Sequence, residues 1–153
     1  MYLGATIAQT PVLNSIMTMI TPRDLVRSSL EDAVADPSGI TEETVDRYWE
    51  LLRYPGNRQA AVDRANTPRG GPFAPEDVAG LTMPSLVMWG ALDQVTPPSG
   101  AEFYAEHLPN DTAITYDAVG HVPMEEAPET SVSDFEKWLL NLAETIQEPE
   151  AAE

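Results

Sequence analysis

The sequence predicts an α/β fold in which helices precede a strand–helix–strand–helix unit with parallel strands. In the first 66 residues, apolar residues recur at helical spacing in short segments that proline and glycine interrupt. In the second half, apolar segments at 85–89 and 113–116 are typical of strands, the first of them covered on both faces. Residues 98–108 lie between them and are long enough for a crossover helix. We therefore expect parallel strands with a right-handed connection.

The first two of four predicted helices begin where a threonine precedes a proline. Thr10 and Thr21 each match an N-cap followed by proline at the first helical position. Asp24 is placed for a reciprocal capping interaction in the second helix, which the Asp-Pro-Ser-Gly sequence at 36–39 ends. The apolar positions are Val12, Leu13, Ile16, Met17 and Ile20 in the first helix, and Leu25, Val26, Leu30 and Val34 in the second.

The third and fourth predicted helices are separated by a turn. Thr41 begins the third helix, where two glutamates in the first turn complement the helix dipole. A Tyr-Pro-Gly sequence at 54–56 ends this helix, and Asn57 is predicted to cap a fourth that runs to about residue 65. The apolar stripe of the third helix is Val45, Tyr48, Trp49 and Leu52.

A linker is predicted at 67–76, because three prolines and two adjacent glycines cannot continue a helix or a central strand. It divides the helical region, 1–66, from the region with the strands, 77–146, and residues 147–153 form an acidic tail. Two helices are expected to cover the sheet. Their apolar positions are Ala101, Tyr104, Ala105 and Leu108 in the crossover helix, and Val132, Phe135, Trp138, Leu139, Leu142 and Ile146 in the helix at 128–146.

An aspartate and a histidine follow the two predicted strands. Asp93 comes shortly after the strand that stops at Gly90, and His121 comes shortly after the second strand. Parallel neighbouring strands end at the same edge of a sheet, so we expect the two side chains to meet there. Such a pair can transfer protons near neutral pH. Taken one at a time, Asp93 could simply cap the following helix region and His121 could be a satisfied turn residue.

Two segments together resemble the C-terminal part of the α/β-hydrolase fold superfamily. They are Trp-Gly-Ala-Leu-Asp at 89–93, with Thr-Pro at 96–97, and Gly-His-Val-Pro-Met-Glu-Glu-Ala-Pro-Glu at 120–129. The resemblance covers residues 84–146 well and the preceding helices more loosely. It implies a partial α/β-hydrolase fold, with a helical lid at 1–66 and the C-terminal part of the core at 77–146.

The resemblance also implies roles for individual residues. In the family, the first segment carries the acid of a catalytic triad and the second carries the histidine. Asp93 is therefore expected to be the catalytic acid and His121 the catalytic base. The candidates for substrate contact are Val95, Val122, Tyr48 and Trp49. The two aromatic residues lie at helical spacing and could instead be core residues.

The nucleophile of the family is not found in this sequence. It is expected upstream, in a Gly-x-Ser-x-Gly turn between a strand and a helix. No serine or aspartate of the 153 residues has a glycine two positions away on both sides, and the chain contains no cysteine. Ser85 and Ser99 are weak candidates for a relocated nucleophile, because neither lies in such a turn. We therefore expect the lid and C-terminal portion of a hydrolase whose N-terminal half is missing.

Two functions are compatible with these features. The first is a hydrolase portion for ester, amide, epoxide, haloalkane or carbon–carbon bonds. It would be inactive alone and would act on a small-molecule substrate once an N-terminal half completes it. The second is a non-catalytic interaction module that pairs with a complementary half or forms a homo-oligomer. An unpaired edge of the strand at 85–89 would favour such pairing.

The chain is strongly acidic, with a net charge of −17. The charge is concentrated after residue 69, where one lysine faces 16 acidic residues. Such a surface repels phosphate backbones and anionic lipids, so neither nucleic acid nor a membrane is an expected partner. The first 21 residues contain no lysine or arginine, and Pro11 and Asn14 interrupt their apolar character. A secretory signal is therefore not expected. The expected location is cytoplasmic.

No metal or cofactor is expected. His121 with Glu125 and Glu126 is a poor ligand set, because prolines on both sides prevent a regular helical face. The two glutamates are instead expected to fix the turn after the histidine. His107 lies near a predicted helix end, where a structural or solvent-facing role is expected.

Overall fold

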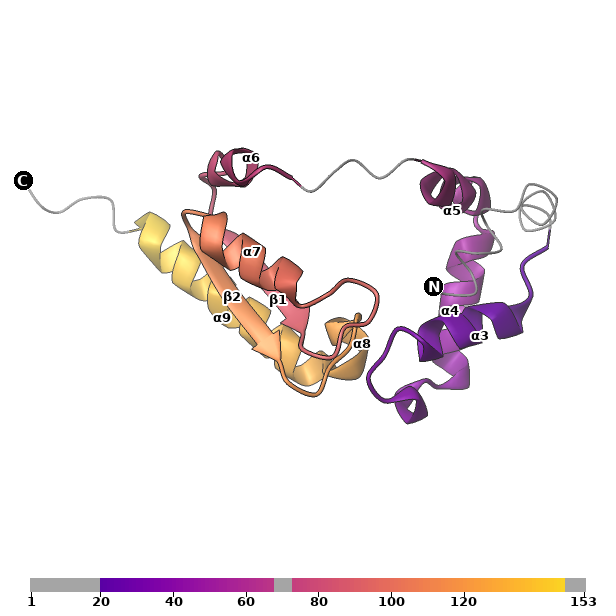
Figure 1. Cartoon of the computed structure of the whole chain (residues 1–153). Helices are drawn as coiled ribbons and strands as arrows, with labels where there is room; N and C mark the ends of the chain where they lie inside the picture. Colours follow the sequence, from indigo (N-terminus) through magenta and orange to yellow (C-terminus); the bar gives the residue numbers. More distant parts are fainter. Residues whose placement is uncertain (1–19, 68–72, 148–153) are drawn as a thin grey trace, which may run out of the picture. The chain divides into compact units, whose positions relative to one another are not determined.

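The structure is a computed structural model that describes residues 20–67 and 73–147 (Figure 1). The chain divides into two compact units, Met1–Gly71 and Pro72–Glu153. The predicted first helix before Ile20, residues 68–72 of the predicted linker and the predicted tail after residue 147 lie outside the described residues.

The helical unit has a small apolar core. Its described elements are α3 (Arg23–Glu31), a 3₁₀ turn (Pro37–Gly39), α4 (Glu42–Arg53) and α5 (Asn57–Asn66). Val26 and Leu30 of α3 pack with Val45 of α4, which is fully buried. Tyr48, Trp49 and Leu52 pack against this core and remain partly exposed. The helical spacing of the apolar residues thus predicted the second and third helices, but α3 ends at Glu31, so Val34 lies outside the helix in which it was predicted.

The ends of these helices agree only in part with the sequence prediction. Thr41 is the N-cap of α4, and its Oγ1 accepts from the backbone N–H of Thr44 at 3.1 Å. At α3, however, Pro22 occupies the cap position and makes no side-chain cap hydrogen bond, so the predictions of Thr21 as the N-cap and of Pro22 as the first helical residue are wrong. Thr21 is buried, and its carbonyl accepts from the indole Nε1 of Trp49 at 2.9 Å. This contact holds the segment before α3 against α4.

The start of α5 also differs from the prediction. Gly56 is the N-cap, at a φ of 88° that suits glycine. Asn57 is the first helical residue, and its side-chain amide donates to the carbonyl of Leu51 at 2.7 Å. Asn57 therefore closes the turn between α4 and α5 and does not cap α5.

The second unit contains two parallel strands and four helices among its described residues. In chain order these are α6 (Pro75–Ala79), β1 (Ser85–Gly90), α7 (Ser99–His107), β2 (Asp111–Tyr116), α8 (Pro123–Glu126) and α9 (Pro128–Gln147). The strands pair in register from Ser85 with Asp111 to Gly90 with Tyr116. The predicted parallel strand–helix–strand–helix unit is confirmed. Helix α6 begins inside the predicted linker, because Pro75 starts a helix at its first position and does not break one.

Helices α7 and α9 pack against the β1–β2 sheet (Figure 1). Trp89 of β1 meets Tyr104 of α7, with ring centroids 6.4 Å apart. Ile114 of β2 instead lines a cavity of about 340 Å³ together with Trp138 of α9. Because Trp89 pairs with Thr115, and successive side chains of a strand point to opposite faces, the two helices cover opposite faces of the sheet.

Burial in this unit is lower than the sequence predicts. Strand β1 is only partly buried up to Trp89, although we expected it to be covered on both faces. Ala105, predicted to face the sheet, is exposed. In α9, Trp138 and Leu142 are partly buried, but the other predicted core positions are exposed. These are Val132, Phe135, Leu139 and Ile146, with exposed fractions of 54, 45, 42 and 70%.

The physical reason for this lower burial is the small size of the sheet. Two strands of six residues each cannot cover a helix of 20 residues, which is about 30 Å long. An apolar stripe therefore remains exposed on α9. No helix in the part of the chain that the structure describes is long and apolar enough to cross a membrane.

Candidate active site

The two strands end side by side, and the loops that follow are held together by their backbones. Gly90 and Tyr116 are the last paired residues. Beyond them, the N–H of Ala91 donates to the carbonyl of Tyr116, and the N–H of Leu92 donates to that of Val119, both at 2.9 Å. The loop after β1 is therefore fixed to the loop after β2 immediately before Asp93.

Gly90 is required for this close approach. A Cβ atom at this position would lie 2.0 Å from the carbonyl oxygen of Gly120 and 2.3 Å from that of Val119. Both neighbours are backbone atoms, so no side-chain rotation can make room. The backbone before His121 thus crosses the end of β1 at a distance that only glycine allows.

Asp93 and His121 are in hydrogen-bond contact. His121 Nδ1 lies 2.9 Å from Asp93 Oδ2. The Asp93 side chain is 4% exposed, whereas that of His121 is 37% exposed. The ring therefore has one nitrogen at a buried carboxylate while other atoms of the same ring remain accessible. The two side chains thus meet at the edge of the sheet, as the positions of Asp93 and His121 after the two strands predict.

The Asp93 carboxylate accepts from several donors in its own loop. Oδ1 accepts from the N–H groups of Val95 and Thr96, both at 2.8 Å. Oδ2 accepts from the hydroxyl of Thr96 at 2.7 Å, in addition to its contact with His121. Burial alone would raise the pKa of Asp93, but the hydrogen bonds from His121, Thr96 and Val95 outweigh it. The pKa is lowered from its ordinary value near 3.8, so the carboxylate is ionised at neutral pH.

This lowered pKa predicts how Asp93 contributes to stability. A carboxyl with a lower pKa in the folded state stabilises the fold above the unfolded pKa, and this contribution disappears as the pH falls through the folded pKa. Asp93→Asn should therefore reduce the free energy of unfolding by about 1–3 kcal/mol at pH 6–7. The difference from the wild type should shrink below about pH 4. Urea titrations followed by NMR signals of β1 would measure it, and a difference that does not vary with pH would contradict the prediction.

Glu126 holds the backbone on both sides of His121. Its two carboxylate oxygens each accept from the N–H of Gly120 at 2.9 Å, and Oε1 also lies 3.3 Å from the N–H of Val122. Glu126 lies on the single turn of α8, which Pro123 begins. The expected role of this glutamate in fixing the turn after the histidine is therefore confirmed.

Replacing Glu126 with alanine should loosen the histidine loop. Two partly buried N–H groups would lose a charged acceptor, and each such loss destabilises by about 1–3 kcal/mol. Amide hydrogen exchange at Gly120 and Val122 should become at least about tenfold faster. Glu129→Ala is a matched control, because Glu129 is exposed in the first turn of α9. Equal exchange rates in both variants would exclude the proposed clamp.

Val95 and Val122 lie next to the pair in the chain and are both half-buried. Val95 contributes a backbone N–H to Asp93, and Val122 contributes one to Glu126. Their predicted contact with a substrate stays a prediction.

Tyr48 and Trp49 belong to the helical unit and have different surroundings. Tyr48 lines an apolar groove of about 410 Å³. Trp49 donates to the carbonyl of Thr21, and the guanidinium of Arg53 lies 4.1 Å from its ring centroid. The indole is thus engaged in the packing of its own unit.

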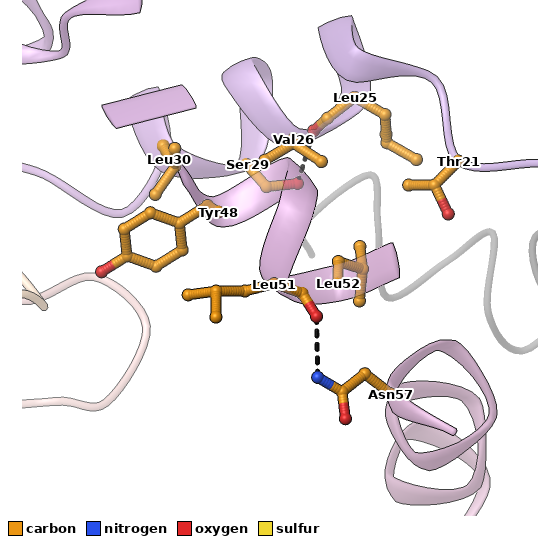
Figure 2. A pocket seen from close by; sticks show the side chains of 9 residues that line it. All are labelled: Thr21, Leu25, Val26, Ser29, Leu30, Tyr48, Leu51, Leu52 and Asn57. Carbon is orange, nitrogen blue, oxygen red and sulfur yellow. Dashed lines mark hydrogen bonds between the residues drawn. The ribbon is translucent and has the colours of Figure 1, made fainter. Parts of the chain in front are cut away.

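The groove is bordered mainly by hydrocarbon, with Thr21, Ser29 and Asn57 as its other lining residues (Figure 2). Two polar side chains at its border donate to the backbone: Ser29 Oγ to the carbonyl of Leu25, and Asn57 Nδ2 to that of Leu51. The apolar lining residues are Leu25, Val26, Leu30, Tyr48, Leu51 and Leu52. The groove therefore favours an apolar occupant.

The remaining candidate residues have structural surroundings. Ser85 lies at the amino end of β1, opposite to the site, and its hydroxyl donates to the carbonyl of Met83 at 3.1 Å. Ser99 is exposed at the start of α7. His107 Nδ1 lies 2.8 Å from the carbonyl of Phe103, and the two rings are 4.6 Å apart. Within residues 20–67 and 73–147, no three His, Cys, Asp or Glu residues are grouped as metal ligands would be.

Sequence reasoning missed two residues of this site. The contact of Thr96 with both Asp93 and His121 was not predicted, although the Asp-x-x-Thr spacing is typical of a turn in which aspartate accepts from the following residues. Gly90 was predicted only as the end of the strand. Its close approach to Gly120 depends on a residue 30 positions away, so no local pattern indicates it.

Comparison with known proteins agrees with this architecture. A family profile described as alpha/beta hydrolase fold matches residues 22–128. The chain is 31% identical over 118 residues to the uncharacterized hydrolase YugF of Bacillus subtilis (strain 168), a match that covers 73% of this chain and 42% of YugF. It is 40% identical over 58 residues to lipase 3 of Moraxella sp. (strain TA144), which covers 38% of this chain and 18% of the lipase.

Solved structures share the fold. The meta-cleavage product hydrolase CumD from Pseudomonas fluorescens IP01 superposes with a TM-score of 0.65 at 21% identity, over 82% of this chain and 48% of CumD. CarC, a serine hydrolase involved in carbazole degradation, gives a TM-score of 0.68 at 21% identity, over 89% of this chain and 59% of CarC. The chain thus spans less than two thirds of the length of each of these relatives. The matched profile, the identity to YugF and the observed architecture together lead to one conclusion: the chain belongs to the α/β-hydrolase fold family.

Proposed function

We propose that this chain supplies the catalytic acid and base of an α/β-fold hydrolase, with Asp93 as the acid and His121 as the base. The observation that carries the proposal is the 2.9 Å contact between His121 Nδ1 and a buried, ionised Asp93. Burial at the carboxylate with exposure of the ring is the arrangement that a general base needs. Family membership supports the proposal independently.

The proposed chemistry is proton transfer at the second ring nitrogen. With Nδ1–H donated to Asp93, His121 Nε2 is a neutral base. It takes the proton of an attacking hydroxyl while that oxygen bonds to the substrate carbonyl, and it then passes the same proton to the leaving oxygen. Asp93 stabilises the imidazolium that forms between these two steps.

A carboxylic ester is the substrate class that we propose to test first. The relative that is 40% identical over 58 residues is named as a lipase. Hydrolysis of amide, epoxide, haloalkane or carbon–carbon bonds is also compatible with an Asp–His acid–base pair. Substrate contact by Tyr48 stays a prediction; within its own unit, Tyr48 lines a largely apolar groove.

The nucleophile is proposed to come from a complementary N-terminal half. No serine of the sequence lies in the glycine-flanked turn that this chemistry requires. The chain spans 42% of YugF and 48% of CumD, which leaves room in such proteins for that half. The proposed partner is therefore a polypeptide that carries the nucleophile and the oxyanion donors.

The experiment that tests this proposal is hydrolysis of a short-chain activated ester. The purified chain is assayed with and without the N-terminal half of YugF supplied in trans. Turnover only with the added half, and its loss in His121→Ala, is the expected result. Robust turnover by the chain alone would overturn the proposed source of the nucleophile, and mutation of Ser85 and Ser99 would then identify the group responsible.

A non-catalytic interaction module is the second candidate, and the exposed apolar stripe of α9 favours it. Phe135 and Leu139 are among the residues of this stripe, and an exposed apolar patch of this kind marks an interaction surface. Sedimentation of wild type and of Phe135→Glu/Leu139→Glu would distinguish a self-associating chain from a monomer. A dilute monomer with no ester turnover in the presence of the added half would exclude both candidates.

A further inference from the structure

A threonine hydroxyl lies between the two members of the pair. Thr96 Oγ1 is 2.7 Å from Asp93 Oδ2 and 3.3 Å from His121 Nδ1. The carboxylate oxygen and the ring nitrogen are themselves 2.9 Å apart. Three polar atoms are therefore within hydrogen-bond reach of one another.

The hydroxyl is held in place by its own backbone. The N–H of Thr96 donates to Asp93 Oδ1 at 2.8 Å, and its carbonyl accepts from the indole Nε1 of Trp89 at 3.2 Å. Pro97 follows, which restricts the backbone of the preceding residue to extended conformations. The position of Oγ1 is thus fixed by contacts that do not involve the histidine.

The chemistry of the three atoms determines where the protons lie. An ionised carboxylate only accepts hydrogen bonds, whereas a hydroxyl has one proton to donate and two lone pairs. The distance of 2.7 Å from Thr96 to Asp93 is typical of a hydroxyl that donates to a carboxylate. Once this proton is directed at Asp93, Thr96 presents a lone pair to His121. Nδ1 then faces two acceptors, and only a proton on Nδ1 satisfies both.

We propose that Thr96 is a positioning residue that keeps the proton of the neutral His121 ring on Nδ1. The Nδ1–H group donates mainly to Asp93 and secondarily to Thr96, and Nε2 remains free of a proton. Without the hydroxyl, one of the two acceptors is lost, and the ring can rotate away from Asp93. The consequence for catalysis rests on the proposed function, but the state of the ring does not.

The test is the tautomer of His121 in the full-length chain, measured by long-range ¹H–¹⁵N NMR of the imidazole nitrogens. His121→Gln distinguishes the signals of His121 from those of His107. The wild type should have a protonated Nδ1 and an unprotonated Nε2 at a pH where the ring is neutral. Thr96→Val should shift the population toward protonated Nε2, and Thr96→Ser should retain the wild-type pattern. Because Thr96 is exposed, valine creates no cavity at this position.

Two results would overturn the proposal. One is a wild-type spectrum with the proton on Nε2, which requires no variant to fold. The other is a Thr96→Val spectrum identical to that of the wild type.

The enzymatic readout separates this inference from the proposed function. In the ester assay with the added N-terminal half, Thr96→Val should lower kcat about tenfold with KM unchanged, which corresponds to one charge-assisted hydrogen bond. Thr96→Ser should restore kcat. A tautomer shift without any ester turnover in the wild type would support the role of Thr96 and reject the hydrolase. Wild-type kcat in Thr96→Val would reject the role of Thr96 and leave the hydrolase intact.

Discussion

Asp93→Asn is expected to reduce ester turnover by about 10⁴-fold in the enzyme completed by an N-terminal half. The asparagine amide can donate to His121 Nδ1 at the place where the carboxylate accepts. The ring would then place its proton on Nε2, and the base would be lost while the loop keeps its shape. Steady-state kinetics with the short-chain ester would measure this effect, with kcat falling and KM little changed.

Asp117→Asn is the matched control for this substitution. Asp117 is exposed and directly follows β2. Its replacement by asparagine therefore removes the same charge from the same edge of the sheet. The turnover of Asp117→Asn should stay within about threefold of the wild type, because solvent screens the charge of an exposed carboxylate. Equal losses in the two variants would indicate that net charge, and not the pair, determines the rate.

Gly90→Ala is expected to destabilise the second unit by about 3 kcal/mol or more. The added Cβ would have to displace the backbone of Val119 and Gly120, from which it would be 2.3 and 2.0 Å away. Displacement of this backbone would separate His121 from Asp93, so the NMR signature of the pair should disappear as well. Urea denaturation followed by NMR signals of the paired strands would measure the loss of stability.

Gly39→Ala provides the control for Gly90→Ala. No atom lies within 4 Å of the position of its Cβ, and Gly39 belongs to the exposed 3₁₀ turn of the other unit. Its stability should change by less than about 1 kcal/mol. A stable Gly90→Ala variant with an intact Asp93–His121 contact would contradict the close approach of the two loops.

The contact between Asp93 and His121 could be predicted because its geometry follows from topology. Two apolar strands separated by a helix must run parallel, and the residues after them must meet at one edge. Asp93 and His121 are at those two positions. Helix positions were predictable for a similar reason, since the apolar residues of α3 and α4 follow a period that depends on local sequence alone.

Burial could not be predicted in the same way, because it depends on what lies next to each element. Phe135 and Leu139 have the spacing of core residues, and yet they are exposed on α9. Their exposure follows from the small size of the sheet, which the spacing of apolar residues along α9 does not determine. Caps could not be predicted from residue type alone for a related reason: Pro22 occupies the cap position of α3, and the Asn57 side chain closes the preceding turn.

Chemical rescue of His121→Ala by free imidazole is the most direct test of the claim that His121 is the base. In the ester assay with the added N-terminal half, His121→Ala should lose at least about 10³-fold in turnover. Added imidazole should restore part of this loss, in proportion to its neutral fraction as the pH is varied around its pKa. A His121→Ala enzyme that hydrolyses the ester at the wild-type rate would contradict the assignment of the base.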